Sequence, residues 1–137
     1  MGHMLEGLLR KEIGPLSLVG DIRGRGLFWD VEFVSSKEHK TPFSPKHDFC
    51  GKVIKCALDM GLNILGNLGR TGEYQVDHVL VCPPYITTDA ELAEIVSLLK
   101  ESILKASRPF LEVDQRGDIP NGKVHVKIEQ VGFTEIR

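Results

Sequence analysis

Cysteine is scarce in this sequence, and the spacing of the cysteines indicates no disulfide or metal site. Cys50, Cys56 and Cys82 give an odd count, and none of them belongs to a CxxC pair. Such usage favours neither a disulfide framework nor a zinc site. We therefore expect reduced thiols, as in a cytoplasmic protein.

Long apolar runs and an excess of one charge are also missing. The apolar stretches, such as residues 79–82, fall far below the ~20 residues that a membrane helix requires. The 17 basic and 19 acidic residues are interspersed and leave a net charge of -2, whereas nucleic-acid binders cluster Lys and Arg. Residues 1–3 resemble a cloning remnant, and no signal-peptide pattern follows them. The sequence predicts a globular domain without membrane or nucleic-acid partners.

Motifs that carry catalysis are missing as well. The 137 residues contain no HExxH, P-loop, GxSxG or nucleotide-binding GxGxxG, and the five histidines lack ligand spacing. Asp30 and Glu32 share one strand face, but apolar side chains share it too, which favours a half-solvated surface over a carboxylate pair. The loop 66–72 offers backbone amides and Arg70 to an anion, although most glycine loops hold no ligand.

Three segments have the pattern of strands, and a fourth has two readings. Residues 27–34 alternate apolar and polar side chains, as does a strand with one buried face. Glycines punctuate residues 21–25, which form either a first strand or an irregular approach with a bulge. Residues 62–65 and 78–82 are short apolar runs, and the second ends at a double proline.

Helical periodicity appears in three other places. Leucines at helical spacing before Gly14 predict a short N-terminal helix. Ser44 followed by proline predicts a helix that runs to Met60, and Thr88 with Glu91 forms a capping box for a third helix. We expect an α+β domain with a small, mainly antiparallel sheet of three or four strands. The Ser44 and Thr88 helices should cover one face of this sheet.

The last thirty residues differ in texture from the rest. Asn121 and Gly122 are a turn signal, and apolar residues alternate over 124–129, so a strand or hairpin is predicted there. We therefore expect a domain over residues 4–107 and an extension of unknown role over residues 108–137.

Three separated segments carry a resemblance to a known family. The stretch 19–34 (VGDIRGRGLFWDVEFV) is similar to the segment that opens the small domain of class III aminotransferases. Residues 40–43 (KTPF) and 77–87 (DHVLVCPPYIT) follow in the family's order. The resemblance spans about residues 5–104, and it implies the C-terminal small domain of such an enzyme. Within it, Arg23 and Arg25 are expected to have scaffold roles.

The resemblance implies a parent enzyme that uses pyridoxal phosphate. In the family a lysine of the large domain holds this cofactor, in a region that precedes the motif and that this chain does not contain. Lys37 stands in a surface loop and is interpreted as a solvated lysine. We expect a homodimeric parent that moves amino groups between small-molecule amines and keto acids, and a chain that by itself binds no cofactor and does not catalyse.

One position departs from the family pattern. Several members carry an arginine three residues before the double proline, where it pairs with a substrate carboxylate. Leu80 stands there, which favours an amine or ω-amino substrate, or a displaced arginine for which Arg70 is the candidate. The alternative to an enzyme fragment is a stand-alone binding or oligomerisation module derived from the same fold.

Overall fold

The computed structural model describes residues 1–66 and 76–115. Its elements are α1 (Gly2–Leu8), the π-helix η1 (Leu9–Ile13), β1 (Val19–Arg25), β2 (Phe28–Phe33), the 3-10 helix η2 (Pro45–His47), α2 (Phe49–Asp59), β3 (Leu65–Gly66), β4 (His78–Val81) and α3 (Asp89–Gln115). The chain divides into two units after Ala106, and the fold below is that of the first unit.

The four strands form one antiparallel sheet in the order β1-β2-β4-β3. Ile22 pairs with Val31, and Val31 pairs in turn with Val79, so that one row of buried apolar side chains crosses three strands. The register shifts between Val19 and Asp21, which makes Gly20 the extra residue of a bulge. The predicted α+β class and the small antiparallel sheet are confirmed, and residues 21–25 belong to a true strand.

Two glycines allow the tight turn between β1 and β2. Gly26 has φ of +60° and occupies the first of the two turn positions, as a type II′ hairpin requires. Its carbonyl accepts a 2.8 Å hydrogen bond from Trp29 Nε1. A Cβ at Gly24 would lie 2.6 Å from the Trp29 Cα and 2.3 Å from the Phe28 carbonyl oxygen. Positive φ at Gly26 and close approach at Gly24 thus explain why glycines flank Arg25.

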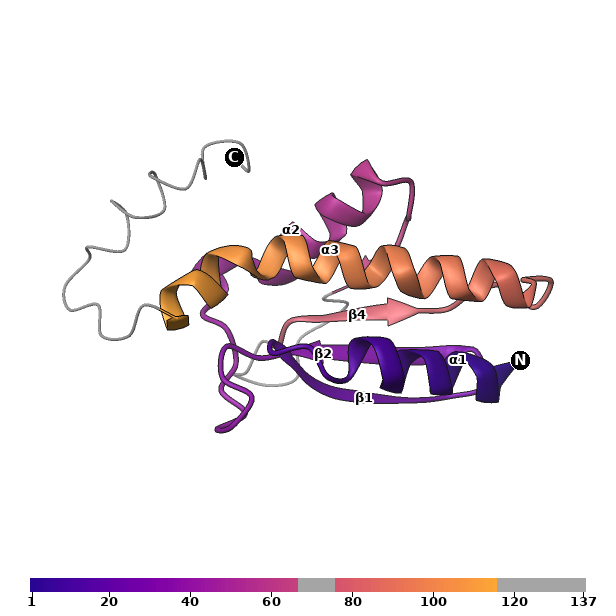
Figure 1. The fold of residues 1–137 in the computed structure, drawn as a ribbon, viewed down its shortest axis with the longest axis horizontal. Helices are drawn as coiled ribbons and strands as arrows, with labels where there is room; N and C mark the ends of the chain where they lie inside the picture. The colour runs from indigo at the N-terminus through magenta and orange to yellow at the C-terminus, as the bar shows by residue number, and fades with distance from the viewer. Residues whose placement is uncertain (67–75, 116–137) are drawn as a thin grey trace. The chain divides into compact units, whose positions relative to one another are not determined.

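The helices lie on one face of the sheet (Figure 1). The η1 segment contacts β1 at one end of the strand order, and α2 contacts β4 and β3 at the other. Between them lies α3, because Lys100 Nζ bonds Glu12 of η1 at 2.9 Å and Lys105 Nζ approaches the Met60 sulfur at 3.6 Å. The predicted cover by two helices is confirmed, and the N-terminal helix joins them.

The core lies between these helices and the sheet. Phe49 of α2 stacks on Phe43, with ring centroids 4.5 Å apart, and meets Phe33 of β2 edge to face at 5.0 Å. Trp29, which also belongs to β2, is buried in the same core. The helices contribute their apolar stripes to the same core through Leu5, Leu9, Ile13, Val53, Ala57, Leu92, Val96, Leu99 and Ile103.

The start of α2 differs from the prediction. Ser44 and proline open only one 3-10 turn, Pro45–His47, and Asp48 then takes a left-handed conformation with φ of +44°. This residue interrupts the helical hydrogen-bond pattern, so the α-helix begins at Phe49 and not at Pro45. The end of α2 at Asp59 agrees with the predicted end at Met60, and Gly61 follows it with a positive φ of +90°.

The last helix begins as predicted and extends further than expected. Thr88 Oγ1 accepts a hydrogen bond from the Glu91 amide, and Glu91 Oε2 accepts one from the Thr88 amide at 2.7 Å, so the capping box is formed. The helix continues to Gln115, and residues 108–115 of the predicted extension are therefore helical. The predicted hairpin around Asn121 lies outside the described residues.

Candidate functional site

Arg70, the substrate-binding candidate, lies outside the described residues, as does most of the loop 66–72. The neighbouring strand is described, and it shows where Leu80 lies. Leu80 pairs across the sheet with Asp30 on β2 and with Leu65 on β3. Its row therefore belongs to the sheet face opposite the helices, which we call the open face.

A network of charged side chains occupies the open face. The Arg23 guanidinium of β1 lies 2.9 Å from an Asp21 oxygen, 3.0 Å from Asp30 and 2.8 Å from Glu32. Register explains this convergence, because Arg23 is the cross-strand partner of Asp30 and Asp21 that of Glu32. Cross-strand neighbours lie close enough for such pairs. The scaffold role predicted for Arg23 agrees with these contacts.

The electrostatics of the network are those of a partly buried ion cluster. Burial raises the pKa of the Asp30 carboxyl, although the nearby His78 and Arg23 act in the opposite direction. The hydrogen bonds that Arg23 donates to Glu32 and Asp21 raise the pKa of Arg23, which stays charged. Within the described residues, Asp30 Oδ1 is buried without a hydrogen-bond partner. Asp30 and Glu32 thus share one arginine and do not form a pair poised for acid-base catalysis.

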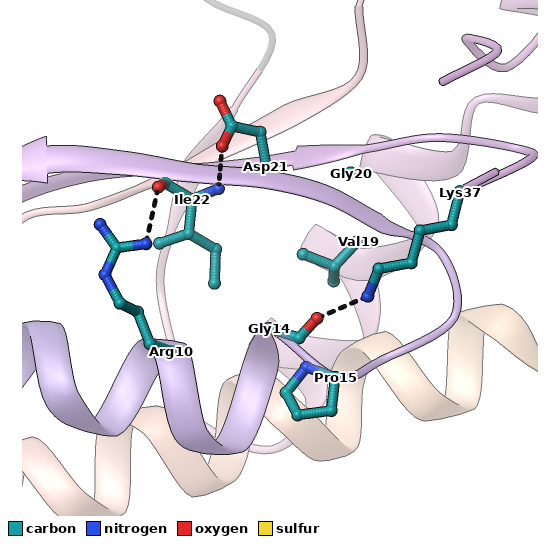
Figure 2. Close-up of a pocket in the computed structure, with 8 residues that line it drawn as sticks. All are labelled: Arg10, Gly14, Pro15, Val19, Gly20, Asp21, Ile22 and Lys37. Carbon is teal, nitrogen blue, oxygen red and sulfur yellow. Dashed lines mark hydrogen bonds between the residues drawn. The ribbon is translucent and has the colours of Figure 1, made fainter. Parts of the chain in front are cut away.

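A groove of about 390 Å³ lies between η1 and β1 (Figure 2). Arg10 and Lys37 point into it from opposite ends, and both donate hydrogen bonds to backbone carbonyls that border it. Their charges are therefore used by the protein itself. Sequence reasoning missed Arg10, because its target, the Ile22 carbonyl, lies twelve positions along the chain.

Lys37 lies at an exposed position of the loop after β2, as predicted, and its ammonium also bonds backbone carbonyls. Its Nζ donates to the Gly14 carbonyl at 2.7 Å and to the Leu16 carbonyl at 3.2 Å. Lys40 Nζ likewise donates to the Gly20 carbonyl. An ammonium engaged in this way is not the free amine that forms a Schiff base. These two described lysines therefore do not fit a covalent cofactor site.

The thiols and histidines also form no reactive centre in the part of the chain that is described. Burial raises the pKa of the Cys50 thiol to about 12, and burial raises the pKa of Cys56 and of Cys82 as well. Raised pKa values leave these groups protonated and poorly nucleophilic. Residues 1–66 and 76–115 contain no cluster of His, Cys, Asp and Glu suited to a metal ion. The same residues contain no helix with the length and apolarity to cross a bilayer.

Comparison with known proteins decides the family. No family model matches the chain. An aminotransferase of Gibberella zeae is 37% identical over 106 residues, which are 77% of this chain and 21% of that protein. The chain is similar to one segment of these aminotransferases. It spans about one fifth of the length of the curated relatives it matches.

Solved aminotransferase structures share the fold of this fragment. A Bacillus anthracis aminotransferase is 34% identical with a TM-score of 0.65, over 75% of this chain and 22% of that one. A pyridoxamine-phosphate (PMP)-bound aminotransferase from Vibrio fluvialis is 27% identical with a TM-score of 0.68, over 78% of this chain and 22% of that one. The predicted resemblance to the small domain of class III aminotransferases is confirmed.

Proposed function

We propose that this aminotransferase fragment forms one wall of the substrate pocket in a pyridoxal-phosphate enzyme. The parent would transfer an amino group from an amine or ω-amino acid to a keto acid. The observation that carries the proposal is the 37% identity over 106 residues, joined to a shared fold with the solved aminotransferases. The open face, which the helices of the fragment leave uncovered, is the surface available to the rest of the parent.

Leu80 supports the proposed substrate class. It lies half-buried on the open face between Asp30 and Leu65, at the position where several family members present an arginine. An apolar side chain there cannot form paired hydrogen bonds to a carboxylate. We propose that Arg70 instead forms these hydrogen bonds with the substrates that carry a carboxylate.

The cofactor would be held by the rest of the parent. When bound, pyridoxal phosphate acts as the electron sink for amino transfer. The fragment contributes no Schiff-base lysine in this proposal, because Lys37 and Lys40 donate to the carbonyls of Gly14, Leu16 and Gly20. The chain alone should neither retain the cofactor nor transaminate.

An absorbance experiment tests this division of roles. Pyridoxal phosphate is added to the purified chain, which is then dialysed and scanned for an aldimine band. We expect no band to survive, in the unchanged chain and in Lys37→Ala alike. A band that persists in the unchanged chain and disappears in Lys37→Ala would place the cofactor on this fragment and contradict the proposal.

A stand-alone binding module is the second candidate, and one observation favours it. Phe28 and Leu65 on the open face are 59% and 60% exposed, and exposed apolar side chains commonly mark contact surfaces. Sequencing the DNA upstream of the coding region separates the two candidates. An adjoining open frame with a cofactor-lysine segment supports the enzyme, whereas a true start at Met4 supports the module.

A further inference from the structure

The β1 strand is one edge of the sheet, so among the described residues no strand pairs with the side that faces away from β2. In an antiparallel pair, every second residue turns its amide and carbonyl away from the partner strand. Ile22 is such a residue, because its amide and its carbonyl both bond to side chains. An edge strand without such side-chain partners can accept a strand from another molecule.

Three charged side chains bond to backbone groups on the outer edge of β1, and Figure 2 shows two of them, Arg10 and Asp21. Asp21 Oδ1 accepts the Ile22 amide at 2.9 Å, and Arg10 Nη1 donates to the Ile22 carbonyl at 3.4 Å. Lys40 Nζ donates to the Gly20 carbonyl, one position before. These residues come from the strand itself, from η1 and from the loop after β2, and together they are called the edge cluster.

The edge cluster is held in place by further contacts. Arg10 Nε bonds Glu6 at 3.0 Å, and its guanidinium carbon lies 5.6 Å from the centroid of the Trp29 ring. Lys40 has a φ of +54°, which is uncommon for a residue with a side chain. From this backbone conformation its ammonium reaches the Gly20 carbonyl of β1.

Packing of η1 alone does not close this edge. The groove of about 390 Å³ between η1 and β1 leaves open space beside Gly20 and Ile22. The barrier is therefore chemical. An incoming strand would have to displace two charged donors from the carbonyls and would leave their charges less solvated.

We propose that the edge cluster of Arg10, Asp21 and Lys40 keeps β1 from pairing with the β1 strand of a second copy of this chain. The inference does not depend on the proposed enzyme function, since it concerns only the folded fragment. The excluded partner is a second copy because it would present the same strand in antiparallel register, with matching amides for the released carbonyls.

Sedimentation of the full 137-residue chain tests the proposal. The double variant Arg10→Gln with Lys40→Asn replaces both charged donors with shorter, neutral side chains, and asparagine tolerates the positive φ at position 40. We expect mass to rise with concentration, with an association constant about a hundredfold above that of the unchanged chain, or about tenfold for each charged hydrogen bond removed. The matched control is Lys37→Ala. It removes a cation that lines the same groove but donates to the Gly14 and Leu16 carbonyls after η1, not to β1.

Hydrogen exchange identifies the surface that pairs. In the associated double variant, amides of peptides covering β1 should exchange at least about tenfold more slowly than in the unchanged chain, while those of α2 should not change. If the double variant fails to fold, Lys40→Asn alone, at an exposed loop position, gives the same test with about a tenfold effect. A mass profile equal to that of the unchanged chain, or equal association in Lys37→Ala, would overturn the proposal.

Discussion

At the scale of single residues, the glycines of the β1-β2 hairpin matter because they have no side chain. Gly24 allows the backbone to approach Trp29, and a methyl group there would overlap the Phe28 carbonyl and the Trp29 Cα. Both contacts are backbone atoms of the neighbouring strand, which cannot rotate away. The hairpin therefore requires a residue without a side chain at this position.

Replacing Gly24 with alanine should lower the free energy of unfolding by about 1–3 kcal/mol, because the added methyl forces the two strands apart. Urea unfolding measures the change. The control is Gly7→Ala in α1, where a Cβ meets nothing within 4 Å and a gain of about 0.5–1 kcal/mol is expected. Equal stability of the two variants would contradict the close-approach argument.

The Asp30 carboxyl is a second residue with a testable property. Its pKa is raised in the folded state, chiefly by burial, so its stabilising contribution is present at low pH and is lost as pH rises through the folded pKa. The unfolding free energy of the unchanged chain minus that of Asp30→Asn should therefore fall as pH increases through the acidic range. Urea unfolding at a series of pH values measures it, and a difference that rises with pH would contradict the assignment.

At the scale of elements, the capping box shows how a local motif fixes the start of α3. Thr88 and Glu91 satisfy each other's amides. The hydrogen bonds that the Glu91 carboxylate accepts from the Thr88 amide and hydroxyl lower the pKa of Glu91. Replacing Thr88 with alanine should cost about 1 kcal/mol of unfolding free energy, because the Glu91 amide loses its acceptor. Thr88→Ser keeps the hydroxyl and is the control in the same urea series. Loss of equal size in both variants would show that the hydroxyl is not responsible.

At the scale of the whole molecule, the fragment and the rest of an aminotransferase should combine into one enzyme. The test is a chimera in which residues of this chain replace the 106 matched residues of the Gibberella zeae protein. We expect amino transfer, and Arg70→Ala should raise KM for a carboxylate-bearing substrate about tenfold or more by removing a charged hydrogen bond.

The control in the chimera is Lys55→Ala, at an exposed position of α2, which should leave kcat and KM unchanged. An Arg70→Ala chimera with an unaltered KM for that substrate would refute the role of Arg70. A chimera that folds and binds the cofactor but transfers no amino group would instead refute the proposed function.

The sequence by itself determined the features that depend on near neighbours. The Thr88 capping box and the apolar stripes of the helices follow from spacing along a few residues, and both appear in the structure. The family followed from motifs in a fixed order. The predicted start of α2 was wrong only because the left-handed Asp48 interrupts a favourable local pattern.

Tertiary structure alone decided the partners of the charged side chains. The three carboxylates around Arg23 come together through strand register. Lys37 reaches the Gly14 carbonyl, 23 positions away, and Lys40 reaches the Gly20 carbonyl, 20 positions away. The physical reason is that a long cationic side chain can satisfy any acceptor within reach, so its type does not specify its target. Only the packing of η1 beside β1 and the order of the strands selects one acceptor among many.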